Sequence, residues 1–201
     1  MTTTSDRIVG LGALLRRTPG RASAASNAGL NRLRAGVLGA NDGIVSVGAT
    51  VVGVAGAAAS TSTVALAGGA ALLAGALSMA SGEYVSVSSQ RDAERVAAAA
   101  GRPITDADED FTNPWQAALA SMLAFTAGAL IPLLVVLAPW PTAARVPATF
   151  AAVLVALVLT GSASARFTGA SHGRSVLRNV LGGSLAMAVT YGIGALVGVA
   201  L

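Results

Sequence analysis

The sequence predicts an all-α integral membrane protein with five transmembrane helices. Charged residues make up 11% of its 201 residues and apolar residues 54%, whereas a soluble domain carries about 25% charged residues. The apolar residues gather into five runs of about 20 residues, the length that crosses a bilayer core about 30 Å thick. Arginines stand at the ends of these runs, as they do in membrane proteins. These observations together predict the fold class.

The five predicted spans form one membrane domain over residues 35–201, at roughly 35–58, 64–89, 115–138, 148–168 and 179–201. A polar turn at 60–63 separates the first two spans, and an acidic linker at 90–114 joins the second to the third. Pro141 and Pro147 bracket the loop before the fourth span. His172 falls in the loop before the fifth span, where we expect a solvated residue. Residues 1–34 are predicted to be an arginine-rich tail, with 8–15 either a short interfacial helix or part of a disordered segment.

The distribution of arginines predicts the orientation of the chain. With five spans, twelve of the thirteen basic residues fall on one side of the membrane and Arg145 alone falls on the other. Positively charged residues favour the cytoplasmic side. We therefore expect a cytoplasmic N-terminus, a cytoplasmic linker at 90–114 and a C-terminus outside.

The composition also excludes several classes of protein. The chain has no cysteine and one histidine, so it has neither disulfides nor a Cys/His zinc site. No nucleophile–base arrangement indicates an enzyme, and the arginines at span ends do not indicate nucleic-acid binding. All basic residues are arginine, and alanine and glycine are abundant. This is typical of a GC-rich bacterial genome and predicts a multi-pass protein of the bacterial plasma membrane.

Two carboxylates stand out in the first two spans. Between Arg34 and Arg91 the only charged side chains are Asp42 and Glu83, and a charge inside a membrane is costly enough to indicate function. Each lies eight residues from the nearer arginine, or about 12 Å inside the boundary. The spacing predicts that both lie at one depth and share a cation site. The alternative for Asp42 is a helix cap or a polar contact with Asn41.

Further donors follow the second carboxylate along its helix. Met79, Glu83, Ser86 and Gln90 are spaced by four, three and four residues, which places them on one side of a helix. Oxygen ligands suit hard divalent cations, and a thioether favours softer first-row metals, so iron(II) and manganese(II) fit better than calcium or magnesium. By itself Met79 would be interpreted as a packing residue. Ser86 and Gln90 are weaker candidates for a pathway.

An acidic cluster in the linker offers a second, weaker candidate for metal capture. It either attracts cations on the cytoplasmic side or is simply a solvated linker, and it consists of Asp106, Asp108, Glu109 and Asp110.

Pairs of small residues four apart predict close helix packing. They are Gly39–Gly43, Ala71–Gly75, Ser78–Gly82 and Gly194–Gly198. We expect these pairs to bring the first two helices together or to form a dimer contact.

Three segments resemble the vacuolar iron transporter family. They are LRAGVLGANDGIVSV at 33–47, GALSMASGEYVSVSSQRD at 75–92 and NPWQAALAS followed by FTAGALIPLL at 113–134. The resemblance implies a five-helix homodimer that moves iron(II), and often manganese(II), out of the cytosol in exchange for protons. It also implies a pathway at the dimer interface, with Asp42, Met79 and Glu83 matching the family's motif residues. No cofactor is implied, since the metal is the transported substrate.

The chain departs from the family in one respect. Typical members carry a cytosolic helical domain rich in metal-binding glutamates between the second and third spans, whereas about 25 residues join Gln90 to Trp115 here. In this the chain resembles the shorter, nodulin-like branch, and capture by that domain cannot be carried over. Two alternatives stay open at this point: a non-transporting membrane scaffold or anchoring subunit, and an exporter of another small cation.

Overall fold

The computed structural model describes residues 22–100 and 113–200, which form five long α-helices. In chain order they are α2 (Ala22–Gly56), α3 (Thr61–Ala99), α4 (Pro114–Leu137), α5 (Thr142–Thr168) and α6 (His172–Ala200). Each contains a segment long and apolar enough to cross a membrane. The predicted all-α fold with five membrane spans is thereby confirmed.

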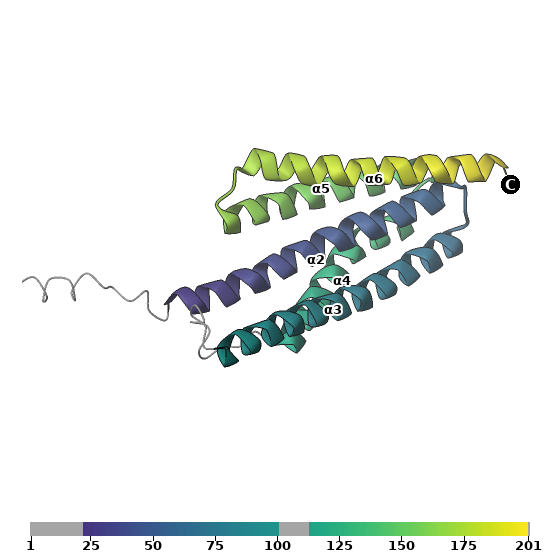
Figure 1. The fold of residues 1–201 in the computed structure, drawn as a ribbon. Helices are drawn as coiled ribbons and strands as arrows, with labels where there is room; N and C mark the ends of the chain where they lie inside the picture. The colour runs from purple at the N-terminus through teal and green to yellow at the C-terminus, as the bar shows by residue number, and fades with distance from the viewer. Residues whose placement is uncertain (1–21, 101–112, 201) are drawn as a thin grey trace, which may run out of the picture.

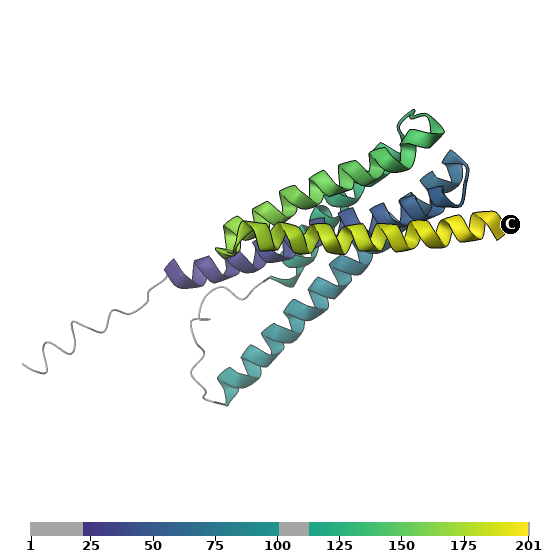
Figure 2. The same ribbon diagram turned by 90° about the horizontal axis from the view of Figure 1, so that it is seen from above.

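The helices run alternately up and down, so the start of α2 and the end of α6 lie at opposite ends of the bundle (Figure 1). In this view α2 lies between a pair formed by α5 and α6 and a pair formed by α3 and α4. It contacts all four of the other described helices, whereas α3 contacts only α2 and α4. Figure 2 shows α3 diverging from the bundle toward its C-terminal end.

Two apolar cores lie on opposite sides of α2. One joins α2 to α5 and α6, and its buried residues are Ile44, Ala49, Val52, Val153, Ala156, Leu157 and Met187. The other joins α2 to α3 and α4, and its buried residues are Val47, Val51, Val64, Ala76, Phe125, Ala129 and Val136. Large apolar side chains such as Leu66, Leu134 and Leu196 are exposed on outward faces, as expected of helices surrounded by lipid.

Several helices are longer than the apolar runs that predict them. α2 begins 13 residues before its apolar segment, which starts at Ala35, and α3 extends to Ala99. Pro147 does not bracket a loop, because it lies within the second turn of α5. His172 is likewise not a loop residue: α6 begins there, directly after a turn in which Gly169 ends α5 with a φ of 67°. Apolar runs mark the part of a helix that lipid surrounds, whereas backbone hydrogen bonding continues into polar residues.

Short turns close the end of the bundle opposite to the start of α2. Ser60 caps α3, because its hydroxyl accepts a hydrogen bond of 3.2 Å from the backbone N–H of Thr63. Arg145, in the first turn of α5, donates a hydrogen bond of 2.8 Å to the hydroxyl of Thr61. The α2–α3 and α4–α5 turns are therefore joined side chain to side chain.

Candidate functional site

Asp42 lies well inside the central helix. It follows Ala22, the first residue of α2, by 20 residues, so the alternative that it caps a helix is wrong. In the single chain its side chain is exposed, as is that of Leu38 one turn earlier. Asp42 therefore stands on an outward-facing stripe of a membrane-spanning helix.

Two hydroxyls continue this stripe. Ser46 donates a hydrogen bond of 2.6 Å to the backbone carbonyl of Asp42, and Thr50 donates one of 2.8 Å to the carbonyl of Ser46. The three side chains stand four residues apart, so they follow one another along one side of α2. Ser46 and Thr50 were not among the candidates predicted from the sequence, although their four-residue spacing from Asp42 was the signal that could have found them.

Close contact between α2 and α4 holds Asp42 in place. A Cβ atom at Gly39 would lie 2.8 Å from the carbonyl oxygen of Ser121, and one at Gly43 would meet the carbonyl oxygen of Phe125. Only glycine allows backbones to approach so closely. The Gly39–Gly43 pair was expected to join the first two spans or to form a dimer contact, but within the described residues it packs against α4.

The candidate ligands of α3 divide into two groups. Met79 and Glu83 are half-buried, and Met79 packs against the core between α2, α3 and α4. Ser86 and Gln90 are exposed, whereas Val87 is buried. The spacing does place all four on one side of the helix. However, the packed face rotates around α3 as the helix leaves the bundle, so the last two lie outside it.

The two carboxylates are staggered along the α2–α3 hairpin. Asp42 precedes the last residue of α2 by 14 residues (56 − 42), and Glu83 follows the first residue of α3 by 22 residues (83 − 61). The difference of eight residues corresponds to about 12 Å. The prediction of one common depth is therefore wrong for the single chain. The prediction counted residues from Arg34 and Arg91. The register of the two helices is instead set by the turn that joins them, and α3 is longer than α2.

Contacts with α4 agree with this stagger. The backbone of Phe125 meets Gly43 on α2, and its ring meets Gly75 on α3, so Asp42 is level with the region of Gly75. The ring of Tyr84, the residue after Glu83, lies 4.8 Å from that of Trp115 in the first turn of α4. Glu83 is therefore level with the start of α4.

The described part of the chain does not assemble a complete metal site by itself. Across residues 22–100 and 113–200, no three His, Cys, Asp or Glu side chains are grouped closely enough to hold a metal ion. The linker cluster of Asp106, Asp108, Glu109 and Asp110 lies outside the described residues. What the structure supplies is a half-buried pair on α3 and an exposed carboxylate on α2.

Two buried side-chain oxygen atoms, one on α2 and one on α4, have no hydrogen-bond partner among the described residues. They are Oδ1 of Asn41 and the hydroxyl of Ser121, which is fully buried. Unsatisfied polar atoms are costly inside a membrane and are rare in native structures. Asn41 was considered only as a contact for Asp42, and Ser121 was missed because a serine in an apolar run is unremarkable in a sequence.

The chain is similar in sequence to a family of known proteins. The sequence model of the VIT family matches residues 33–107 and 98–195. The chain is 47% identical to vacuolar iron transporter homolog 1 of Oryza sativa subsp. japonica over 168 residues, covering 80% of this chain and 72% of the relative. It is 44% identical to vacuolar iron transporter homolog 2 of Arabidopsis thaliana over 166 residues, covering 83% and 84%. With homolog 3 of the same plant the identity is 45%, and the alignment covers 83% of each chain. The five-helix protein belongs to the VIT family.

Proposed function

We propose that this protein transports divalent metal, iron(II) or manganese(II), across the membrane and out of the cytosol in exchange for protons. Membership of the VIT family supports transport of a metal ion, and relatives named vacuolar iron transporter homologs support iron. The observation that carries the proposal is Asp42, a carboxylate on the outward stripe of a membrane-spanning helix.

The exposure of Asp42 supports a homodimer. A carboxylate that faced lipid near the middle of a span would be costly, so its stripe has to meet protein or a water-filled path. We infer that the stripe defined by Leu38, Asp42 and Ser46 faces a second copy of the chain. The carboxylates of the two copies would then lie across from each other and complete the site that one copy lacks.

The stagger along the hairpin supports a stepwise path for the metal. Glu83 is level with the start of α4, and Met79 lies four residues deeper along α3. Asp42 is level with Gly75, which lies four residues deeper than Met79. The steps between the three ligands are therefore about 6 Å each. We propose that Glu83 takes the ion first, that Met79 hands it on, and that Asp42 holds it deepest. In the cytoplasmic orientation indicated by the arginines, the path begins at the cytosol.

Carboxylate ligands supply a means of coupling to protons. A carboxylate binds a metal ion only when it is deprotonated, so protonation from the outer side would release the ion there. Asp42 and Glu83 are the acidic side chains of the described spans that stand on this path. Because protons and the metal ion would compete for the same carboxylate oxygens, one divalent ion would exchange for protons.

Uptake by proteoliposomes tests the proposal. We expect iron(II) and manganese(II) to enter vesicles when the lumen is acidic, and the lumenal pH to rise as they enter. Asp42→Asn should abolish both signals, while a variant of a remote arginine, Arg174→Gln, should retain them. Protein that binds and moves no divalent metal would instead be a membrane scaffold, and equal transport by Asp42→Asn would refute the assignment of the site.

Cross-linking tests the dimer separately. The chain has no cysteine, so a single substitution introduces the only thiol. Leu38→Cys, beside Asp42 on the outward stripe of α2, should form a disulfide-linked dimer in membranes, because the two copies of the stripe face each other. Leu159→Cys, which is 64% exposed on α5, is the matched control and should stay monomeric. Efficient cross-linking through Leu159→Cys alone would place the interface elsewhere.

A further inference from the structure

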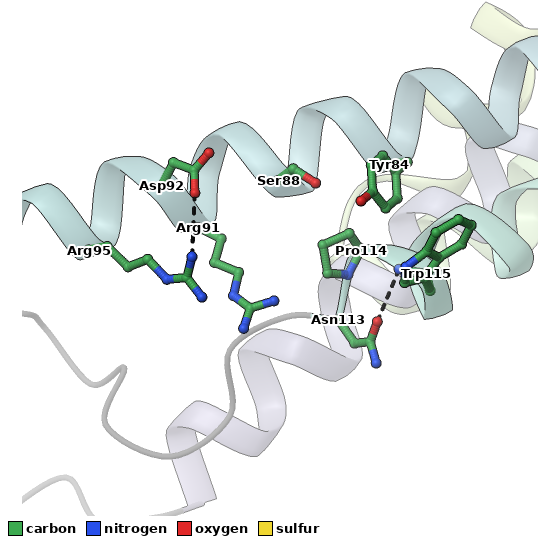
Figure 3. A pocket seen from close by; sticks show the side chains of 8 residues that line it. All are labelled: Tyr84, Ser88, Arg91, Asp92, Arg95, Asn113, Pro114 and Trp115. Atoms are coloured by element: carbon green, nitrogen blue, oxygen red, sulfur yellow. Dashed lines mark hydrogen bonds and ion pairs between the residues drawn. The ribbon is translucent and has the colours of Figure 1, made fainter.

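A polar pocket lies between the C-terminal part of α3 and the start of α4 (Figure 3). Its volume is about 530 Å³. Its lining residues come from the last turns of α3 and the first turn of α4, and they are Tyr84, Ser88, Arg91, Asp92, Arg95, Asn113, Pro114 and Trp115. None of these residues takes part in the proposed metal path.

The charges of the described lining residues favour an anion. Arg91 and Arg95 stand one turn apart on α3, and the carboxylate of Asp92 lies 3.7 Å from the guanidinium of Arg95. The lining side chains that the structure describes thus carry two positive charges and one negative charge. Guanidinium groups bind phosphate through paired hydrogen bonds, whereas a metal cation would be repelled.

The start of α4 adds to this preference. Asn113 caps the helix by accepting a hydrogen bond of 3.0 Å from the backbone N–H of Trp115, and Pro114 occupies the first helical position. The N-terminal end of the helix therefore borders the pocket, and its dipole carries partial positive charge there.

The position of the pocket indicates the source of the phosphate. Tyr84 and Trp115 contact each other at its deeper side, and tyrosine and tryptophan gather at the level of lipid headgroups. Trp115, Leu119 and Leu123, spaced four apart along α4, are all more than 50% exposed. They form an apolar track that leads from the pocket along the span, where an acyl chain would lie.

We propose that this pocket binds the phosphate of an anionic phospholipid, with Arg91 and Arg95 holding the headgroup and the Trp115–Leu123 track holding an acyl chain. In the proposed orientation the lipid belongs to the cytoplasmic leaflet. The bound lipid would fill the space that opens where α3 leaves α4, and it would fix the distance between these two helices.

Quenching of tryptophan fluorescence by brominated lipids tests this proposal on the full-length chain. The chain has two tryptophans, so Trp140→Phe leaves Trp115 as the only reporter. In this background, brominated phosphatidylglycerol should quench Trp115 at a lower mole fraction than brominated phosphatidylcholine, by about fivefold for each arginine engaged. Equal quenching by the two lipids would overturn the proposal without need of any pocket variant.

A matched pair of double variants tests the role of the arginines. Arg91→Gln with Arg95→Gln should bring phosphatidylglycerol to the level of phosphatidylcholine. Arg174→Gln with Arg178→Gln removes the same charge from the start of α6, at the same end of the bundle, and should keep the preference. An equal loss in both would show a general surface charge effect and overturn the pocket. If glycerol phosphate in solution competed as well as the lipid does, the lipid source would be wrong.

Discussion

The two helices that carry the candidate metal ligands are built in opposite ways. α2 contacts every other described helix and lies between the two cores. α3 contacts only α2 and α4, and it diverges from both toward its C-terminal end (Figure 2). Asp42 thus stands on a helix held along its length, and Glu83 on one that is partly uncovered.

This difference separates two requirements of a transport site. On the proposed path the deepest ligand, Asp42, has to keep its position while the ion passes, and the close α2–α4 contact at Gly39 and Gly43 would supply that rigidity. The proposed first ligand, Glu83, has to remain accessible, and α3 would supply access because few helices cover it. Each of the following changes tests one side of this contrast.

The largest effect is expected from removal of the deep carboxylate. Asp42→Asn keeps the size of the side chain but removes its charge, so metal uptake by proteoliposomes should fall by about 100-fold or more. Because Asp42 is exposed in the single chain, the thermal stability of the purified protein should change little. A large loss of stability together with the loss of uptake would mean that Asp42 acts in folding.

Glycine substitutions should separate the two helices by stability. A Cβ at Gly43 would meet backbone atoms of Phe125 and Ala129, whereas one at Gly82 on α3 has nothing within 4 Å. Gly43→Ala should therefore destabilise the fold by about 3 kcal/mol, and Gly82→Ala by less than about 0.5 kcal/mol. Melting of the two variants in the same detergent measures the difference.

The outcome for Gly82 is informative in either direction. If Gly82→Ala melts like the wild type but weakens a cross-linked dimer, then α3 contributes to the contact between copies. A strong loss of stability in the monomer would contradict the open space that the structure has around this residue.

An intermediate effect is expected at Glu83, the shallower of the two carboxylates. Glu83→Gln should lower uptake about tenfold at low metal concentration, and less at high concentration, because a residue that takes the ion first mainly affects its capture. Initial rates of manganese(II) uptake over a range of concentrations measure this. A loss of the maximal rate without a change in half-saturation would place Glu83 at the deep site instead.

The smallest effect is expected at the thioether. Met79→Leu keeps the apolar volume that packs against the core, so stability should fall by less than about 1.5 kcal/mol. The loss of sulfur should lower uptake of iron(II) by about threefold relative to that of calcium(II), which has little affinity for sulfur. An unchanged ratio between the metals would leave Met79 as a packing residue.

Most of the architecture could be predicted from the sequence, because whether a segment enters the membrane depends on the composition of that segment alone. Five apolar runs were enough to predict five helices, since each span has to satisfy its backbone hydrogen bonds internally. The helix ends were predicted less well: Pro147 and His172 were assigned to loops but lie in α5 and α6. Polarity marks the edge of the membrane and not the end of a helix.

The sequence suggests candidate residues for the site but not how they are arranged. Asp42, Met79 and Glu83 stand out in one sequence because charge and sulfur are conspicuous among alanine, valine and glycine. The hydroxyls of Ser46 and Thr50 and the buried oxygen of Ser121 do not stand out, because such side chains occur throughout the spans. Their importance depends on hydrogen bonds and burial, which are absent from a list of residues.

The sequence by itself determined whether each segment is surrounded by lipid or by water. From this follow the number of spans and the high free energy of placing two acidic side chains within them. Tertiary structure decided which helix is central, that Gly39 and Gly43 meet α4 and not α3, and that Asp42 and Glu83 are staggered by about 12 Å. The physical reason is that partition into lipid depends on the composition of one segment, whereas register and contact depend on how the side chains of two helices fit together. Two carboxylates that were predicted to lie at one depth are therefore offset from each other along the hairpin.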